Sequence, residues 1–136
     1  MTYYVIVLVF SEGSLRTTAS TMNKRDRPVT VAETELFTKV AHDCMSKTEL
    51  EAFKFFIACN PTAGDIIPGT GGVRKVRWGI GNRGKSGGAR VIYYFMTPNY
   101  PIYLLTAYSK SKKASLTDSQ KQDIKRIATA IKRSAQ

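Results

Sequence analysis

The spacing of apolar positions changes in a fixed order from residue 28 onward. Residues 28–34 (PVTVAET) read as a short strand. The next two stretches, 34–45 and 46–61, carry apolar residues at helical spacing, and in the second stretch Ser46 and Glu49 have the spacing of a capping box. The apolar positions of these two predicted helices are Leu36, Phe37, Val40, Ala41 and Cys44, then Leu50, Phe53, Phe56 and Ile57.

The second half of the chain returns to strand-like alternation before it closes with a helix. After a glycine-rich loop at 62–72, three strands are predicted at residues 73–78, 87–96 and 102–108. Thr117 and Gln120 form a second capping box, which begins a helix that continues to about Arg133. The order β-α-α-β-β-β-α predicts an α+β fold, with helices packed on one face of a small, mostly antiparallel sheet.

Residues 1–27 differ in pattern from the domain predicted at 28–136. An apolar run at Tyr3–Phe10 gives way to a polar, aperiodic stretch, and Met22 lies shortly before the predicted domain. The segment is therefore either an extension, disordered or due to an upstream start site, or an added strand of the sheet. An exposed apolar run of this length promotes aggregation, so an added strand would need cover.

Basic residues outnumber acidic ones, and they are concentrated in one interval. The chain has 21 Lys and Arg against 10 Asp and Glu, for a formal net charge of +11. No acidic residue occurs between Asp65 and Asp118, where nine basic ones lie: Arg74, Lys75, Arg77, Arg83, Lys85, Arg90, Lys110, Lys112 and Lys113. Such a block indicates a surface that binds an anion, such as nucleic acid or an acidic protein. The alternative is a basic protein whose charge serves only solubility.

One stretch, Gly79–Ser86 (GIGNRGKS), matches the G-x-x-x-x-G-K-[ST] pattern of a phosphate-binding P-loop. A P-loop follows an apolar strand and opens a helix. Here a charged strand precedes the match, and the β-branched and aromatic run GGARVIYYF follows it. The context therefore predicts a hairpin loop, and we expect no nucleotide cofactor.

The cysteines and the single histidine do not form a metal-binding pattern. Cys44 and Cys59 each lie in a predicted helix, and His42 has no second histidine to pair with, so we expect no metal site and no other cofactor. Reduced cysteines are typical of a cytoplasmic protein. The apolar run at Tyr3–Phe10 is too short to cross a bilayer, so no membrane association is expected.

Strand alternation places several polar side chains on one face of the predicted sheet. If Val76 and Trp78 face the core, Lys75 and Arg77 face the other way. Arg74 must then leave the core at the rim of the sheet, or the assignment of directions is one residue out of register. On the next two strands the same alternation adds Arg90, Tyr94 and Tyr108 to the face of Lys75 and Arg77, with Thr106 and Leu104 aligned with Tyr108.

These segments resemble the RelE/HigB superfamily of bacterial type II toxins, most closely its HigB-2-like branch. The likeness rests on VRKVRW, on the G-x-x-G-K-x-G-G-x-R-V-I-Y-Y segment and on IYLLTAYSKSKK with the capped helix after it. It covers about Val29 to Arg133 and is most specific from Gly69 to Lys113. The resemblance implies a RelE-like fold and an mRNA endoribonuclease (an mRNA interferase) that inhibits translation, usually at the ribosome. It also implies a neighbouring antitoxin, often a helix-turn-helix protein, that silences the toxin.

Metal-independent RNA cleavage through the 2′-hydroxyl needs proton removal, stabilisation of charge on the phosphate and protonation of the leaving oxygen. Because His42 is expected to be structural, this work would fall to Lys, Arg and Tyr. Lys75 is the candidate base or phosphate contact, since neighbouring cations lower the pKa of a lysine. Arg77 and Arg90 would stabilise the transition state, and Tyr94 or Tyr108 would stack a base or donate a proton. The candidate RNA-backbone contacts are Arg74, Arg83, Lys85, Lys110, Lys112 and Lys113. By resemblance, the family's basic residues fall at Lys75, Arg77, Arg90 and the Tyr108/Lys110 end.

Two other readings of the same basic face remain. ParE-type toxins share the fold but inhibit DNA gyrase without a nuclease site, and arginines alone do not distinguish the two activities. A plain RNA-binding protein would use the basic face for affinity and leave the RNA intact.

Overall fold

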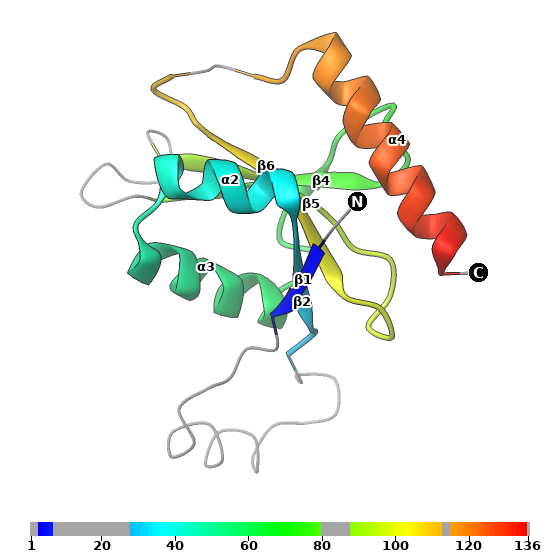
Figure 1. The fold of residues 1–136 in the computed structure, drawn as a ribbon, viewed down its shortest axis with the longest axis horizontal. Coiled ribbons are helices and arrows are strands. Elements are labelled where there is room, and N and C mark those ends of the chain that lie inside the picture. Colours follow the sequence, from blue (N-terminus) through cyan, green and yellow to red (C-terminus); the bar gives the residue numbers. More distant parts are fainter. Residues whose placement is uncertain (1–2, 7–27, 80–87, 113–114, 136) are drawn as a thin grey trace.

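The computed structural model describes residues 3–6, 28–79, 88–112 and 115–135 of the chain (Figure 1). Within these ranges the protein is α+β, as predicted, with a six-stranded mixed sheet and three helices. In chain order the elements are β1 (Tyr3–Ile6), β2 (Val31–Thr34), α2 (Glu35–Cys44), α3 (Lys47–Cys59), β3 (Asp65–Ile66), β4 (Val73–Trp78), β5 (Ala89–Tyr94), β6 (Ile102–Ser109) and α4 (Asp118–Ser134). The short strand β3 lies in the stretch expected to be a loop.

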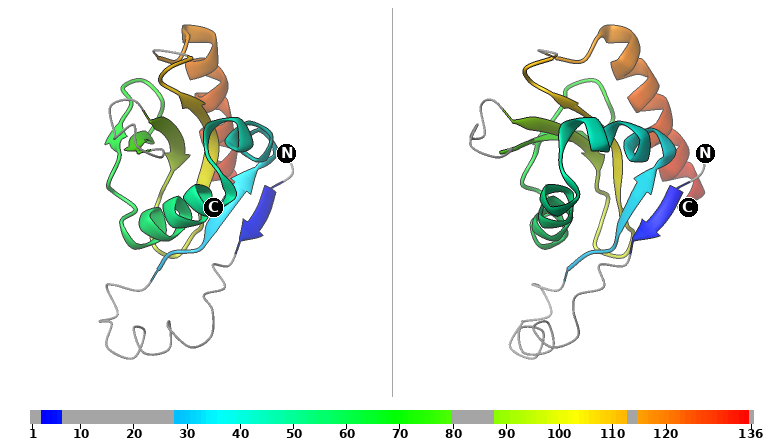
Figure 2. Two further views of the ribbon diagram at one scale, coloured as in Figure 1. Left: turned by 90° about the vertical axis from the view of Figure 1, so that its left-hand side faces the viewer. Right: turned by 60° about the vertical axis from the view of Figure 1, so that its left-hand side comes forward.

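The strands lie in the order β1-β2-β6-β5-β4-β3. Neighbouring strands are antiparallel except β2 and β6, which pair in parallel although the two are far apart in sequence. Figure 2 shows β1 lying beside β2 at the edge of the sheet, so residues 3–6 form the added strand considered above.

Both helix starts that the capping-box patterns predicted are confirmed. Ser46 and Glu49 exchange side-chain-to-backbone hydrogen bonds of 3.0 and 3.1 Å at the start of α3. Thr117 and Gln120 do the same at the start of α4. A third cap comes from Thr34, whose hydroxyl accepts a hydrogen bond from the Phe37 amide and donates one to the Leu105 carbonyl on β6. No helix within the described ranges is both long and apolar enough to cross a bilayer.

The expectation that all helices pack on one face of the sheet is wrong. One core cluster joins α2 and α3 to one face through residues such as Phe37, Phe53 and Val91. A second cluster joins α4 to the opposite face through residues such as Ile124 and Ile92. Figure 1 accordingly shows α2 and α3 on one side of the strands and α4 on the other. The reason is that β5 and β6 are buried along both faces, so each face needs a layer over it.

An irregularity in β6 also changes one predicted direction. Ile92 pairs with Thr106, whereas the next residue, Tyr93, pairs with Leu104, so Leu105 is an extra residue in β6. Leu104 therefore packs in the α2–α3 core, on the face opposite to the one expected from simple alternation with Tyr108.

Candidate functional site

Three of the predicted site residues lie side by side across the sheet. On β4 and β5, Arg77 is directly paired with Arg90, and on β5 and β6, Arg90 is directly paired with Tyr108. Directly paired residues of antiparallel strands project from the same face with their Cβ atoms about 5 Å apart. We call Arg77, Arg90 and Tyr108 the cross-strand row. Sequence alternation thus gave the correct face for all three residues.

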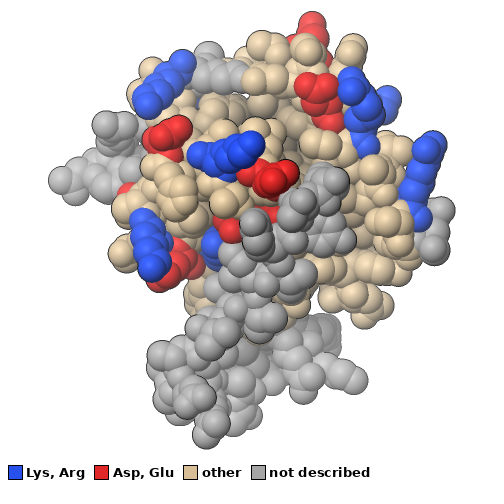
Figure 3. Space-filling model, viewed as in Figure 1, with Lys and Arg blue, Asp and Glu red and all other residues tan. Residues whose placement is uncertain are grey.

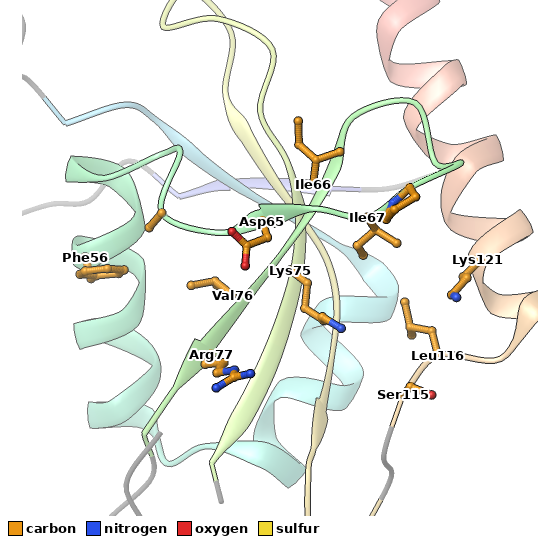
Figure 4. Close-up of a pocket in the computed structure, with 12 residues that line it drawn as sticks. Phe56, Asp65, Ile66, Ile67, Lys75, Val76, Arg77, Ser115, Leu116 and Lys121 are labelled. Atoms are coloured by element: carbon orange, nitrogen blue, oxygen red, sulfur yellow. The ribbon is translucent and has the colours of Figure 1, made fainter. Parts of the chain in front are cut away.

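Lys75 lies on the same face as Arg77, two residues along β4, and both side chains are exposed. They line a hollow of about 700 Å³, which we call the β4 hollow. Figure 4 shows Lys75 and Arg77 on β4, with Leu116, just before α4, and Lys121, in the first turn of α4, across from them. The hollow therefore has cations from two separate segments of the chain, an arrangement suited to an anionic ligand.

Arg90 and Tyr108 lie deeper than Arg77. Arg90 is 3% exposed and Tyr108 is 8% exposed. Burial raises the pKa of Tyr108 above the ordinary value for tyrosine, and the charge of Arg90 opposes part of that rise. Tyr108 therefore keeps its phenolic proton at neutral pH. Tyr108 does not line the β4 hollow but a separate, mostly apolar hollow of about 210 Å³ between α2 and α4, together with residues such as Leu36 and Ile127.

Tyr94 lies apart from the cross-strand row. It pairs with Val73 at the opposite end of β4, is buried and belongs to the α4 core cluster. Burial raises the pKa of its hydroxyl. Of the two candidate tyrosines, the structure brings only Tyr108 next to Arg90.

Arg74 leaves the core at the rim of the sheet, as its alternation required. Its Nη1 donates hydrogen bonds of 2.7 Å to the Gly64 carbonyl and 3.5 Å to the Thr62 carbonyl. The guanidinium thus holds the segment that leads into β3, which gives Arg74 a structural role beside any contact with RNA.

The remaining predicted RNA contacts follow β6 or lie in the glycine-rich hairpin. Lys110 and Lys112 are exposed in the turn after β6, and the Lys110 amide bonds to the Gly88 carbonyl at 3.1 Å. Lys112 is close enough to Cys44 for its charge to oppose the burial that raises the pKa of that thiol. The predictions for Arg83, Lys85 and Lys113 lie outside the described residues.

The P-loop-like stretch connects two paired antiparallel strands. Trp78 at the end of β4 pairs with Ala89 at the start of β5, so a strand follows the glycines, as predicted, where a P-loop needs a helix. Gly88 fits here because a Cβ at this position would clash with the Trp78 carbonyl. His42 is exposed on the last turn of α2. Among the described residues, no group of three or more His, Cys, Asp or Glu side chains is placed to hold a metal ion.

The residues of the β4 hollow that were not anticipated from the sequence include Phe56 on α3, Asp65 on β3 and Lys121 on α4. Each comes from an element whose position relative to β4 depends on tertiary packing. For Lys121 the sequence offers one local indication. It lies four residues after the Thr117 cap, in the first turn of a predicted helix, so its side chain lies near the segment that precedes the helix.

The charge around the β4 hollow differs from that of the face shown in Figure 3. On that face, which looks onto α2, lysines and arginines lie among aspartates and glutamates. Around the β4 hollow, Lys75, Arg77 and Lys121 accompany one carboxylate, that of Asp65. No protein-family model matches the chain.

Proposed function

We propose that the protein is an endoribonuclease of the RelE/HigB type, the toxin of a type II toxin–antitoxin system that cuts mRNA and so inhibits translation. The observation that carries this proposal is the cross-strand row, whose outermost member, Arg77, lines the β4 hollow together with Lys75. Together these residues offer two exposed cations, a buried arginine and a protonated tyrosine, which are the groups that RNA cleavage without histidine needs.

In the proposed reaction, the 2′-oxygen of a ribose attacks the adjacent phosphorus while the bond to the 5′-oxygen breaks. Arg77 and Lys75 are exposed, so they would hold the phosphate and stabilise its extra negative charge. Lys75 is also the candidate to receive the proton of the 2′-hydroxyl. Tyr108, which keeps its proton at neutral pH, would protonate the leaving 5′-oxygen. The products are a 2′,3′-cyclic phosphate and a 5′-hydroxyl end.

Arg90 would act from behind the other two members of the row. Because it is 3% exposed, it has little access to a bound phosphate through solvent. It stands directly between Arg77 and Tyr108, so its positive charge would stabilise negative charge on a phosphate held by Arg77 and on the Tyr108 oxygen. We assign it to positioning Tyr108 and to long-range stabilisation of the transition state.

The proposed partners follow from the same basic face. The ribosome and its mRNA present dense negative charge, and an acidic antitoxin segment across the β4 hollow would both neutralise and block it. The nine basic residues between Asp65 and Asp118, with no acidic residue among them, support a polyanionic partner.

The test is induced expression in bacteria with mapping of the 5′ ends of cellular mRNA. We expect growth arrest and new message ends for the parent protein, and loss of both for Arg77→Ala. Lys39→Ala is the matched control, since Lys39 is an exposed cation on α2, away from the β4 hollow. It should behave as the parent does.

Each other outcome identifies a different activity. Arrest with intact message and inhibited gyrase supercoiling would establish a ParE-type inhibitor. No arrest, with RNA bound but uncut, would establish a plain RNA-binding protein. Arg77→Ala must show the parent's circular dichroism spectrum for its loss of activity to count.

A further inference from the structure

The β4 hollow continues past its cations to an aromatic end on α3. Phe56 lines this end, half-buried, together with Ala63 and Val76. Figure 4 shows Phe56 on α3, on the opposite side of β4 from Leu116 and Lys121. The hollow thus runs across the edge of β4, from a basic end to an aromatic end.

The aromatic end is held in place by two further rings. The ring centroids of Phe56 and Trp78 lie 5.2 Å apart, and Trp78 packs edge-on against the fully buried Phe53 at 5.4 Å. Because Phe53 belongs to the α2–α3 core, the three rings form one packed cluster, in which Phe53 is buried and Phe56 and Trp78 are partly exposed. A ring already held by packing loses little conformational entropy when a ligand stacks on it.

Asp65 lies between the aromatic end and the cations. Its exposed carboxylate lines the β4 hollow, and Figure 4 places it between Phe56 and Lys75. A carboxylate repels a phosphate, so the backbone of a bound strand would be kept at Lys75 and Arg77. The same carboxylate can accept a hydrogen bond from the amino group of a base, as acidic side chains do with cytosine.

We propose that Phe56 and Asp65 form a nucleobase-binding subsite, in which an unpaired base next to the bound phosphate stacks on Phe56 and donates its amino group to Asp65. The inference rests on the proposed function, because it takes the ligand to be single-stranded RNA. A positively charged groove with an aromatic ring beside it is the usual arrangement for such strands. The subsite favours cytosine over uracil, which has no exocyclic amino group.

Trp78 provides a direct readout, since it is the only tryptophan in the chain and touches Phe56. The probes are three 2′-O-methyl hexamers, which cannot be cleaved through the 2′-oxygen: hexacytidine, hexauridine and an abasic ribose-phosphate chain. We expect hexacytidine to quench Trp78 fluorescence and to bind about 5- to 150-fold more tightly than the abasic chain, as one stacked base provides. Hexauridine should bind with intermediate affinity.

Two variants separate the subsite from the phosphate contacts. Phe56→Leu keeps apolar bulk but removes the aromatic face, and it should bind hexacytidine only as tightly as the abasic chain. Phe55→Leu is the matched control, because Phe55 is an exposed phenylalanine on the same helix that does not line the β4 hollow. It should bind all three chains as the parent does. Asp65→Ala should remove the preference for cytosine over uracil.

Equal affinity for all three hexamers in the parent, without quenching, would overturn the subsite and leave the phosphate contacts intact. An unchanged affinity of Phe56→Leu for hexacytidine would do the same. If no hexamer binds even at low salt, the proposed RNA ligand and the subsite both fail.

Discussion

Arg90 and Tyr108 are a charged and a titratable side chain placed side by side with almost no access to water. Burial favours the neutral form of Tyr108, and the guanidinium of Arg90 favours the phenolate. The burial effect is the larger, so the proton stays on Tyr108 beyond the pH at which a free tyrosine loses it. A tyrosine in this state can donate a proton but cannot accept one at neutral pH.

Removal of the Tyr108 hydroxyl by substitution should abolish most of the proposed cleavage and leave the fold intact. We expect Tyr108→Phe to lower the cleavage rate by about 10²- to 10⁴-fold, as the loss of a general acid does. In the parent protein, loss of activity through deprotonation of Tyr108 should have its midpoint above pH 10, because burial raises the pKa of Tyr108 above its ordinary value of 10.0. Rates of cleavage of a short RNA by the purified protein between pH 7 and pH 11, with the alkaline hydrolysis of the RNA alone subtracted, check both statements. A rate for Tyr108→Phe within threefold of the parent would remove Tyr108 from the chemistry.

A second tyrosine, Tyr93, stabilises the fold through two hydrogen bonds to the backbone. Its hydroxyl donates to the Pro61 carbonyl and accepts from the Gly64 amide, both at 2.8 Å, and so fixes the segment that leads into β3. Close packing adds to this restraint, since a Cβ on Gly64 would come within 2.8 Å of the Lys75 carbonyl oxygen. The position of Lys75 thus depends on a tyrosine on the opposite face of the sheet.

We expect Tyr93→Phe to lower the free energy of unfolding by about 1–3 kcal/mol, because two backbone groups lose their partner. Tyr100→Phe is the matched control. Its hydroxyl donates to the Ala135 carbonyl at 2.9 Å from an exposed site, where water can take its place. Urea unfolding of both variants measures the difference. Equal losses would mean that the buried position of Tyr93 adds nothing.

At the scale of elements, local pattern predicted helices, most strands and facing directions. Alternation on β4 and β5 correctly put Lys75, Arg77 and Arg90 on one face, because side-chain direction within a strand is fixed by the backbone. Capping boxes marked the starts of α3 and α4 for the same reason, since their hydrogen bonds span three residues.

The rest of the architecture depended on contacts between distant segments. The extra residue Leu105 reverses the direction of Leu104, and nothing in IYLLTAY marks that position. The side of the sheet that α4 covers, and hence the presence of Lys121 in the β4 hollow, is decided by which face of β6 the preceding helices leave uncovered. Sequence therefore predicted the basic half of the hollow better than the aromatic half.

One link between elements is an ion pair in the interior. The Lys54 ammonium on α3 lies 3.3 Å from the Glu33 carboxylate on β2, and both side chains are at most 10% exposed. A single substitution that leaves the other charge buried should cost about 3–5 kcal/mol, whereas replacement of both charges costs much less. We therefore expect Glu33→Gln and Lys54→Met each to be strongly destabilised, and the double variant to be more stable than the sum of the two losses predicts.

A double-mutant cycle by urea unfolding checks this coupling. If the losses of unfolding free energy in the two single variants add up to that of the double variant, the two charges do not stabilise each other, although they lie only 3.3 Å apart. The exposed pair of Arg126 and Asp123 on α4, 3.1 Å apart, is the matched comparison and should show little coupling.

At the scale of the whole molecule, the cations of the β4 hollow come from two elements that are far apart in the sequence, β4 and α4. β4 lies near one edge of the sheet, and α4 covers the face that Lys75 and Arg77 share. A phosphate chain bound there would touch several segments at once and displace counterions from each. Salt dependence of binding is the property that reports this number of contacts.

The logarithm of the association constant for hexacytidine should fall linearly with the logarithm of salt concentration, with a slope of about −0.7 for each phosphate contact. Lys75→Ala should reduce the slope by about 0.7, whereas Phe56→Leu should weaken binding with no change of slope. Lys39→Ala should alter neither quantity. Titrations followed by Trp78 fluorescence or anisotropy at four salt concentrations give these slopes. A shallower slope for Phe56→Leu would mean that its ring acts on the phosphates.

The position of β6 has a consequence for how the protein is made. β6 alone joins β2, with β1, to β5, β4 and β3. The hydrogen bond from the Thr34 hydroxyl to the Leu105 carbonyl joins residues 71 positions apart, so it can form only after β6 has been synthesised. A growing polypeptide emerges N-terminus first, so β2, α2, α3 and β4 leave the ribosome while the strand that unites them is still unmade, and Arg77 and Arg90 have no Tyr108 beside them. If the proposed function holds, the candidate site is incomplete throughout most of the protein's own synthesis, because Tyr108 can join Arg90 only after β6 has been translated.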